Sequence, residues 1–354
     1  MILLNSLFDL MEEKNASDLH VSAGLLPYLR VDGDLVAVGS SPVNRDQLER
    51  EINELLSEEQ KEAFKRSGAL DFALDFKSRR YRCNLFSHLK GVALAARAIP
   101  TNIQSIDQLG LPPVLKKIAM VRSGLILVTG VTGSGKSTTL AAMLDHINTH
   151  RREHVITIED PIEFIHNDKK CLINQRELGT HTLSFSNALR EALREDPDVI
   201  LVGEMRDLDT ISLALRAAAT GHLVFSTLHT MGTVNTVNRI INVFPPEEQN
   251  HIRALLADVI SAVISQVLLR RARGAGRVAA MSIMVASPAV RNLIRRGQAH
   301  QIPGTVMDNG KERGMQTLRS AIQDLIRKRE VSEEEGLSYM SLEDMGGYSP
   351  DETE

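Results

Sequence analysis

The chain has 354 residues, of which 43% are hydrophobic and 24% charged, and its formal net charge is -4. These values are ordinary for a soluble globular protein, and the length allows two domains with cores of their own. Its two cysteines, Cys83 and Cys171, stand far apart and outside any C-x-x-C pair, which excludes a disulfide framework and a zinc knuckle.

The N-terminal segment MILLNSLFDLMEEK does not have the pattern of a signal peptide. It carries acids at Asp9, Glu12 and Glu13 and lacks a basic first region and a small-residue cleavage site. The most apolar helix-length window, residues 255–269, is too short and too polar to span a bilayer. We therefore expect a cytoplasmic protein whose association with any membrane is peripheral.

Residues 1–100 predict an N-terminal α+β domain. A helix opens the chain, and YLRVDGDLVAV predicts a strand, an Asp-Gly turn and a second strand. Helical periodicity follows over residues 45–68, and DFALDF, RYRCNLFSHL and VALAARAIP predict three more strands. The next stretch, 101–118, contains Pro112 and Pro113 and is predicted to be a linker.

Residues 119–330 change to a strand, turn, helix pattern. GLILVTG, VITIED, VILVGE and LVFSTLH are apolar runs that end in polar residues, which is typical of buried parallel strands. Ligands bind such sheets at the carboxyl ends of the strands, so the residues that follow these runs are the site candidates. The last segment, 331–354, carries eight acids and no lysine or arginine, and it predicts a disordered tail.

The segment GVTGSGKSTT, residues 130–139, contains the pattern G-x-x-x-x-G-K-[ST] between a predicted strand and a predicted helix. In such a phosphate loop the backbone N–H groups and the helix N-terminus bind phosphates, Lys136 reaches the β and γ oxygens, and Ser137 binds Mg²⁺. We therefore expect a nucleoside triphosphate and Mg²⁺ here, held by Gly130, Thr132, Gly133, Ser134, Gly135, Lys136, Ser137 and Thr138.

Acidic residues follow two other predicted strands. Glu204 follows VILVG, where a carboxylate could hold Mg²⁺ through water, and Glu159, Asp160 and Glu163 follow VITI. Glu163 is the best candidate to orient and partly deprotonate the attacking water, with Pro161 fixing the turn before it. Taken singly, each acid is more often a solvated loop residue, but three strands that end at one phosphate loop favour a site.

Two histidines flank the predicted strand LVFSTL. Thr227 and His229 stand at its carboxyl end, where a histidine beside a γ-phosphate could sense the charge of that group. His222 stands before the same strand. We include His222 and Thr227, with Glu159 and Asp160, among the nucleotide-binding candidates, and structural packing remains the alternative for His222.

Five segments in order, NASDLHV, GVTGSGKSTT, ITIEDPIEF, DPDVILVGEMRD and TGHLVFSTLHT, resemble motifs of the secretion ATPase superfamily, specifically the type IV pilus retraction ATPases (PilT family). The resemblance covers nearly the whole chain. It implies an α/β protein with a PAS-like N-terminal domain and a RecA-like P-loop NTPase domain, forming a cytoplasmic hexamer that hydrolyses ATP. Glu163 would be the catalytic glutamate, Glu204 the Walker B acid and His229 the γ-phosphate sensor.

The family also supplies arginines from the N-terminal domain to the nucleotide of the adjacent subunit, and the matching residues are Arg80, Arg82 and Arg97. Arg80 and Arg82 alternate along one strand and so project to one face, and a guanidinium stabilises spreading γ-phosphate charge. Without the resemblance, a solvated basic strand is the alternative. The implied partners are further copies in a homohexamer and a pilus platform protein at the inner membrane, and a paralogous retraction ATPase is left open.

The direction of pilus movement is less directly encoded. The region LLRRARGAGRVAAMSIMV lacks the four-cysteine zinc insertion that is common in assembly and type II secretion relatives, which favours retraction. Residues 289–303 resemble the family's AIRNLIRE retraction element but carry Val290 and, in place of glutamate, Arg296. A helix with Leu293 and Ile294 on one side is equally consistent with core packing.

Three alternatives remain beside a retraction motor: an accessory family member, an assembly-type secretion ATPase and a RecA-like nucleic-acid motor. The last should show a basic stripe or stacking aromatics. Only residues 270–277 form a dense basic run, and 4% of the residues are aromatic. We therefore expect no nucleic-acid partner.

Overall fold

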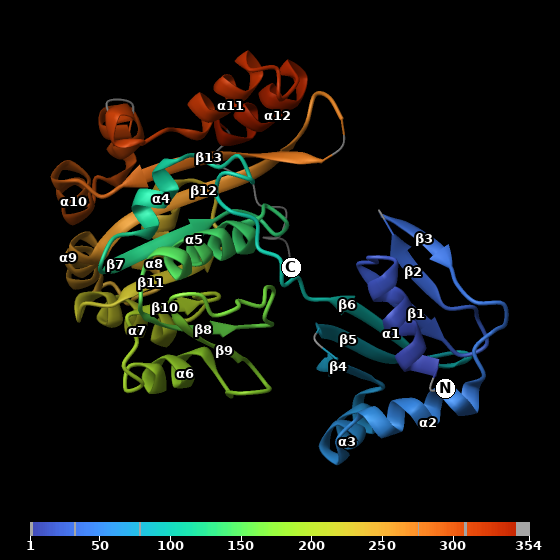
Figure 1. The fold of residues 1–354 in the computed structure, drawn as a ribbon. Helices are drawn as coiled ribbons and strands as arrows, with labels where there is room; N and C mark the ends of the chain where they lie inside the picture. Colours follow the sequence, from blue (N-terminus) through green and yellow to red (C-terminus); the bar gives the residue numbers. More distant parts are fainter. Residues whose placement is uncertain (1–2, 32, 78, 275, 308–309, 345–354) are drawn as a thin grey trace. The chain divides into compact units, whose positions relative to one another are not determined.

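The computed structural model describes residues 3–31, 33–77, 79–274, 276–307 and 310–344. The chain divides into two compact units, Met1–Thr101 and Asn102–Glu354, called unit 1 and unit 2 below (Figure 1). Both units combine helices with a β-sheet, which confirms the predicted α/β class.

Unit 1 is an antiparallel sheet with helices packed on one face. The strand order is β3-β2-β1-β6-β5-β4. In β5, Tyr81, Cys83 and Leu85 are buried while Arg82 and Phe86 are exposed, so one face meets the helices and the other does not. The elements are α1 Leu3–Glu13, β1 Asp18–Ser22, β2 Tyr28–Val31, β3 Asp34–Ala37, α2 Arg45–Leu55, α3 Glu58–Ser67, β4 Ala69–Phe76, β5 Arg79–His88 and β6 Gly91–Ala98.

The predicted helical stretch 45–68 ends at Gly68 but divides into two helices. Ser57 forms a capping box with Gln60, which begins α3, and the preceding Leu56 is extended. Gly68 ends α3 with a φ of 71°, a left-handed conformation that glycine adopts without a steric cost. The predicted single helix is therefore two helices, α2 and α3, separated by Leu56 and Ser57.

Unit 2 is a seven-stranded sheet in the order β13-β12-β7-β11-β10-β8-β9, and every neighbouring pair is parallel except β12 with β13. The predicted apolar runs form β7, β8, β10 and β11. Leu125 and Leu127 face one core while Ile126 and Val128 face the other, which explains why these strands are apolar without interruption. The strands are β7 Gly124–Thr129, β8 His154–Glu159, β9 Leu172–Glu177, β10 Val199–Val202, β11 Leu223–Leu228, β12 Ile260–Arg270 and β13 Arg277–Val285.

Helices cover both faces of this sheet (Figure 1). The α-helices of unit 2 are α4 Val114–Ala119, α5 Lys136–His150, α6 Phe185–Ala192, α7 Leu208–Ala219, α8 Thr233–Asn242, α9 Gln249–Val259, α10 Pro288–Arg295, α11 Leu318–Arg327 and α12 Glu333–Asp344. In α10, Val290 and Ile294 are fully buried and Leu293 packs against the same core, so this element packs as an ordinary amphipathic helix while Arg296 is exposed. Among the described helices, none has the length and apolarity needed to cross a bilayer.

Two predicted segments differ from the structure. Residues 102–118 of the predicted linker 101–118 belong to unit 2, where Ile106, Leu111 and Leu115 are buried in the core. The predicted disordered tail begins instead with an ordered helix, α12, whose Met340 is buried with Val331 against α11 and the β12–β13 pair. The acidic composition of the segment led to the prediction of disorder, although Val331 and Met340 are buried. Residues 345–354 of the predicted tail lie outside the described residues.

Candidate functional site

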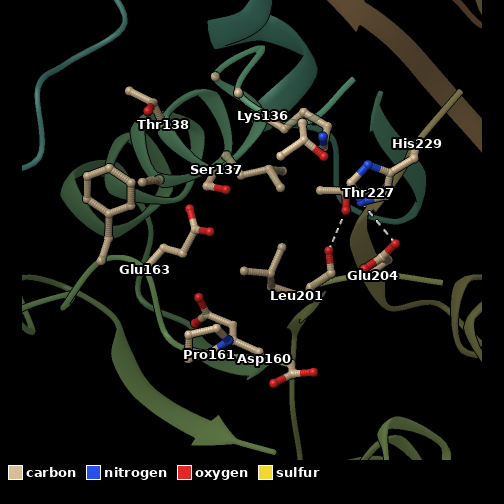
Figure 2. A pocket seen from close by; sticks show the side chains of 18 of the residues that line it. Lys136, Ser137, Thr138, Asp160, Pro161, Glu163, Leu201, Glu204, Thr227 and His229 are labelled. Carbon is tan, nitrogen blue, oxygen red and sulfur yellow. Dashed lines mark hydrogen bonds and ion pairs between the residues drawn. The ribbon is translucent and has the colours of Figure 1, made fainter. Parts of the chain in front are cut away.

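A cavity of about 580 Å³ opens at the carboxyl ends of the parallel strands of unit 2 (Figure 2). The phosphate loop between β7 and α5 forms one wall. The residues that follow β8, β10 and β11 form much of the rest, and β12 and β13 add Leu268 and Arg277. The cavity therefore lies where parallel α/β sheets bind their ligands.

The phosphate loop is held in its turn by glycine geometry and by its own lysine. Gly130, Gly133 and Gly135 have φ values of 144°, 78° and 86°, which other residues adopt only with strain. The ammonium of Lys136 donates to the carbonyl oxygens of Gly130 at 2.9 Å and Val131 at 3.1 Å. Burial lowers the pKa of Lys136, and the nearby carboxylates of Glu204 and Glu163 oppose that shift.

A buried glutamine of β12 supports the loop from below. The side chain of Gln266 donates to the carbonyl oxygen of Ser134 at 2.6 Å and accepts from the hydroxyl of Thr139 at 2.9 Å. It thereby ties the loop to the first turn of α5. A Cβ added at Gly130 would collide with the Gln266 backbone carbonyl, so only glycine fits this approach.

The loop after β8 brings Glu163 to the cavity. Glu163 is exposed, and Figure 2 shows its carboxylate directed toward Ser137. Glu159 is held differently, because its Oε1 accepts from Thr157 at 2.6 Å and from Gln175 at 3.2 Å. Burial raises the pKa of Glu159, so this carboxyl is easier to protonate than a solvated one.

The opposite wall carries a linked acid and histidine. Oε1 of Glu204 lies 3.0 Å from Nε2 of His229 (Figure 2). Oε2 of Glu204 lies 2.7 Å from Nε of Arg206. Behind them the hydroxyl of Thr227 donates to the carbonyl oxygen of Gly203 at 2.5 Å, which joins the ends of β10 and β11. The acid and the histidine are therefore presented to the cavity as one unit.

Comparison with known proteins assigns this arrangement to a family. Residues 2–337 match the family described as type II/IV secretion system protein. The chain is 48% identical over 323 residues to the type IV pilus retraction ATPase PilT of Pseudomonas aeruginosa, covering 91% of this chain and 93% of that protein. It is 36% identical over 334 residues to the type IV pilus ATPase PilU of the same organism, covering 94% and 87%.

A solved structure agrees with these sequences. The crystal structure of the pilus retraction motor PilT with bound ADP superimposes with a TM-score of 0.88 at 39% identity, covering 99% of this chain and 97% of that one. The chain belongs to the pilus retraction ATPase family. This membership confirms the resemblance that the five sequence motifs indicated, and with it the assignment as an ATPase.

In this family member the structure gathers most of the predicted site residues around the one cavity. Gly130 and Ser134 belong to the phosphate loop but are not among the described residues that line the cavity. The predicted residues that line the cavity are Thr132, Gly133, Gly135, Lys136, Ser137, Thr138, Glu159, Asp160, Glu163, Glu204, Thr227 and His229.

His222 is not among the described residues that line the cavity, so its predicted role in nucleotide binding stays a prediction that this geometry does not support. It precedes the N-terminal end of β11, roughly 16 Å along the strand from Thr227 at a rise of about 3.3 Å per residue. Its Nδ1 lies 3.0 Å from the carbonyl oxygen of Ala217 and 3.2 Å from the hydroxyl of Thr220. His222 therefore packs at the turn after α7, on the edge of the sheet that parallel strands do not use for ligands.

Of the lining residues that were not predicted as site residues, three carry ionisable side chains. Arg206 contacts Glu204, as described above, and His166 is buried at the end of the Glu163 loop. Arg277 comes from β13, and its guanidinium donates to the carbonyl oxygen of Gly133 at 3.4 Å. The sequence signal for Arg277 was the basic run 270–277, which only the strand pairing places beside the phosphate loop.

The three predicted trans arginines lie on the face of the unit 1 sheet away from the helices. Arg82 and Arg97 are directly opposite each other on β5 and β6, and Arg80 shares the face of Arg82. Arg97 Nε lies 2.6 Å from Oδ1 of Asp18, and Arg80 pairs with an aspartate of β4. Although burial raises the pKa of Asp18, hydrogen bonds from Ser17 and Arg97 hold it below its usual value.

Proposed function

We propose that this chain binds ATP with Mg²⁺ in the unit 2 cavity and hydrolyses it, and that the energy drives retraction of a type IV pilus. The observation that carries the proposal is the convergence of Lys136 and Ser137, Glu163, and the Glu204–His229 pair on one cavity, in a chain 48% identical to PilT. Phosphoryl transfer needs these parts: a phosphate cradle, a metal site, a group that orients water and a sensor for the γ-phosphate.

Each residue has a separate task in the proposed reaction. Backbone N–H groups of the loop and Lys136 bind the phosphates, while the Ser137 hydroxyl and, through water, Glu204 would hold the metal. Mg²⁺, when bound, neutralises charge on the β and γ oxygens. Glu163 orients the attacking water and takes its proton, which its exposed carboxylate on the cavity wall can do without moving through packed side chains.

We further propose that the active unit is a homohexamer in which Arg80, Arg82 and Arg97 act on the nucleotide of an adjacent subunit. Arg82 and Arg97 place two like charges side by side, an arrangement that an anion between them would stabilise. The proposed location is the cytoplasmic face of the inner membrane, against a pilus platform protein. The similarity to PilU also makes a paralogous retraction ATPase a candidate partner.

Replacement of Glu163 by glutamine tests the catalytic assignment. Glu163→Gln should bind ATP like the parent but hydrolyse it about 100-fold to 10,000-fold more slowly, because the water loses its base while the phosphate loop is intact. Glu247→Gln, an exposed glutamate outside the cavity, is the matched control and should keep parental turnover. Parental turnover by Glu163→Gln would remove Glu163 from this role.

Deletion of the gene tests the biological direction of the motor. Cells without this chain should carry excess pili that do not retract, as counted by electron microscopy and by fluorescence imaging of labelled pili. Absence of pili would instead indicate an assembly ATPase. Normal retraction, together with a purified ring that does not turn over ATP, would indicate an accessory member.

A further inference from the structure

The loop that carries Glu163 is tied to the edge strand β9 by two side chains that do not belong to any nucleotide-binding motif. β9 pairs in parallel with β8, so that Gln175 stands opposite Thr157 and Glu177 opposite Glu159. Residues two apart on a strand share a face. Gln175 and Glu177 therefore point to the same side of the sheet, and both contact the loop that follows β8.

Gln175 uses its whole carboxamide in this contact. Its Oε1 accepts from the backbone N–H of His166 at 2.8 Å, and its Nε2 donates to the carbonyl oxygen of Phe164 at 2.9 Å and to Glu159 at 3.2 Å. Because one partner is a donor and two are acceptors, the orientation of the amide is fixed. A carboxylate could replace the acceptor of this side chain but neither of its donors.

Glu177 holds the other side of the same loop. Its Oε2 accepts from the backbone N–H of Ile162 at 3.3 Å, its Oε1 accepts from Thr180 at 3.2 Å, and the residue is 5% exposed. The backbone groups that flank Glu163, at Ile162 on one side and Phe164 on the other, are therefore both bonded to β9. Glu163 itself is left exposed toward the cavity.

We propose that Gln175 is a positioning residue for ATP hydrolysis, which holds the 160–166 loop so that the Glu163 carboxylate meets the attacking water. This inference rests on the proposed role of Glu163. Gln175 is not among the described residues that line the cavity, so it acts through the loop rather than on the nucleotide. Misplacement of a reacting group by about 1 Å can cost on the order of 100-fold in rate, which sets the size of effect to expect.

The first test separates positioning from nucleotide binding. Gln175→Ala should lower kcat by about 10-fold to 100-fold and leave the KM for ATP within about twofold, because the phosphate loop is not touched. The matched control is Asn174→Ala, an amide on the same strand that is exposed and bonds to the ring of His154. It should keep the parental kcat. A parental kcat in Gln175→Ala would overturn the proposal.

The second test uses the donor that a carboxylate lacks. Gln175→Glu keeps the size of the side chain and its acceptor for His166, so it should fold even if the alanine variant does not. It should be as impaired as Gln175→Ala, because a carboxylate offers neither of the two donors and places a negative charge beside Glu159. Parental turnover by Gln175→Glu would overturn the proposal.

The third test asks whether Gln175 acts through Glu163. In a double-mutant cycle, Gln175→Ala should slow the parent but have no further effect on the residual turnover of Glu163→Gln. If it slows both by the same factor, Gln175 acts independently of Glu163 and the positioning role is refuted. The proposed function fails separately: Glu163→Gln with parental turnover removes the base, whatever Gln175 does.

Discussion

Acidification should destabilise unit 2 through one buried histidine. His166 is 9% exposed, and its Nδ1 has no hydrogen-bond partner within the part of the chain that is described. Burial lowers its pKa to about 4, with Asp145 opposing the shift and Lys169 adding to it. In the unfolded chain a histidine has a pKa of about 6.5. The unfolded state therefore takes up a proton between these two values while the folded state does not.

The sign and size of the effect follow from that difference. Above about pH 6.5 His166 is neutral in both the folded and the unfolded state and does not reduce the free energy of unfolding. As the pH falls from about 6.5 toward 4, protonation of the unfolded state lowers the free energy of unfolding. The gap of roughly 2.5 units corresponds to about 3 kcal/mol in total, and about 1.4 kcal/mol should be lost between pH 7.5 and pH 5.5. Other groups titrate in this range, so the quantity to measure is the difference between the parent and a variant.

Urea unfolding followed by circular dichroism gives this difference. His166→Gln removes the titrating group, and His251→Gln, which replaces an exposed histidine of α9, is the control. The free energy of unfolding of the parent relative to His166→Gln should fall by about 1.4 kcal/mol from pH 7.5 to pH 5.5. The control should show no such change. A parent-to-variant difference that is equal at both pH values would refute the burial of a neutral imidazole.

Two glycines give further predictions about packing. A Cβ at Gly203 would lie 3.1 Å from the carbonyl oxygen of Ile158. Gly203→Ala should therefore displace the end of β10 that carries Glu204 and slow ATP turnover about 10-fold. The control Gly304→Ala, where no atom lies within 4 Å of the added Cβ, should keep the parental turnover. A Cβ at Gly336 would collide with the Ile326 side chain. Gly336→Leu should therefore detach α12 from α11, which limited proteolysis would show as faster trypsin cleavage near residue 328. An unchanged rate of digestion would contradict the packing of α12 against α11.

The parts of the site that could be predicted are those whose chemistry is complete within a short segment. The phosphate loop needs glycines, a lysine and a hydroxyl at fixed spacing, and all of them lie within ten residues. The acids after β8 and His229 after β11 could be predicted in the same way, because each follows an apolar run that ends at the edge of the sheet where ligands bind. The same logic argues against His222, because it precedes β11 and the direction of a parallel strand decides which of its ends meets the ligand.

The parts that could not be predicted depend on pairing between distant segments. Gln266 supports the phosphate loop from a strand 132 residues away in sequence from its partner Ser134, and Arg277 reaches the loop from the strand beyond. Nothing in the sequence around Gln266 indicates a phosphate, and the basic run 270–277 around Arg277 does not say which loop it meets. The ordered start of the tail was missed for a related reason, since Val331 and Met340 are two apolar residues within an acidic segment and gain their meaning only against α11.

The arrangement of Arg80, Arg82 and Arg97 in unit 1 could be predicted only in part from the sequence. Alternation along β5 predicts that Arg80 and Arg82 share a face, but only the β5–β6 register places Arg97 opposite Arg82. Like charges directly across a strand pair destabilise a sheet. Asp18 offsets part of that cost by pairing with Arg97, and Arg82 has no such carboxylate among the described ion pairs. An anion bound between Arg82 and Arg97 would reduce the remaining repulsion between their guanidinium groups. Under the proposed hexamer, the triphosphate of an adjacent subunit would be that anion.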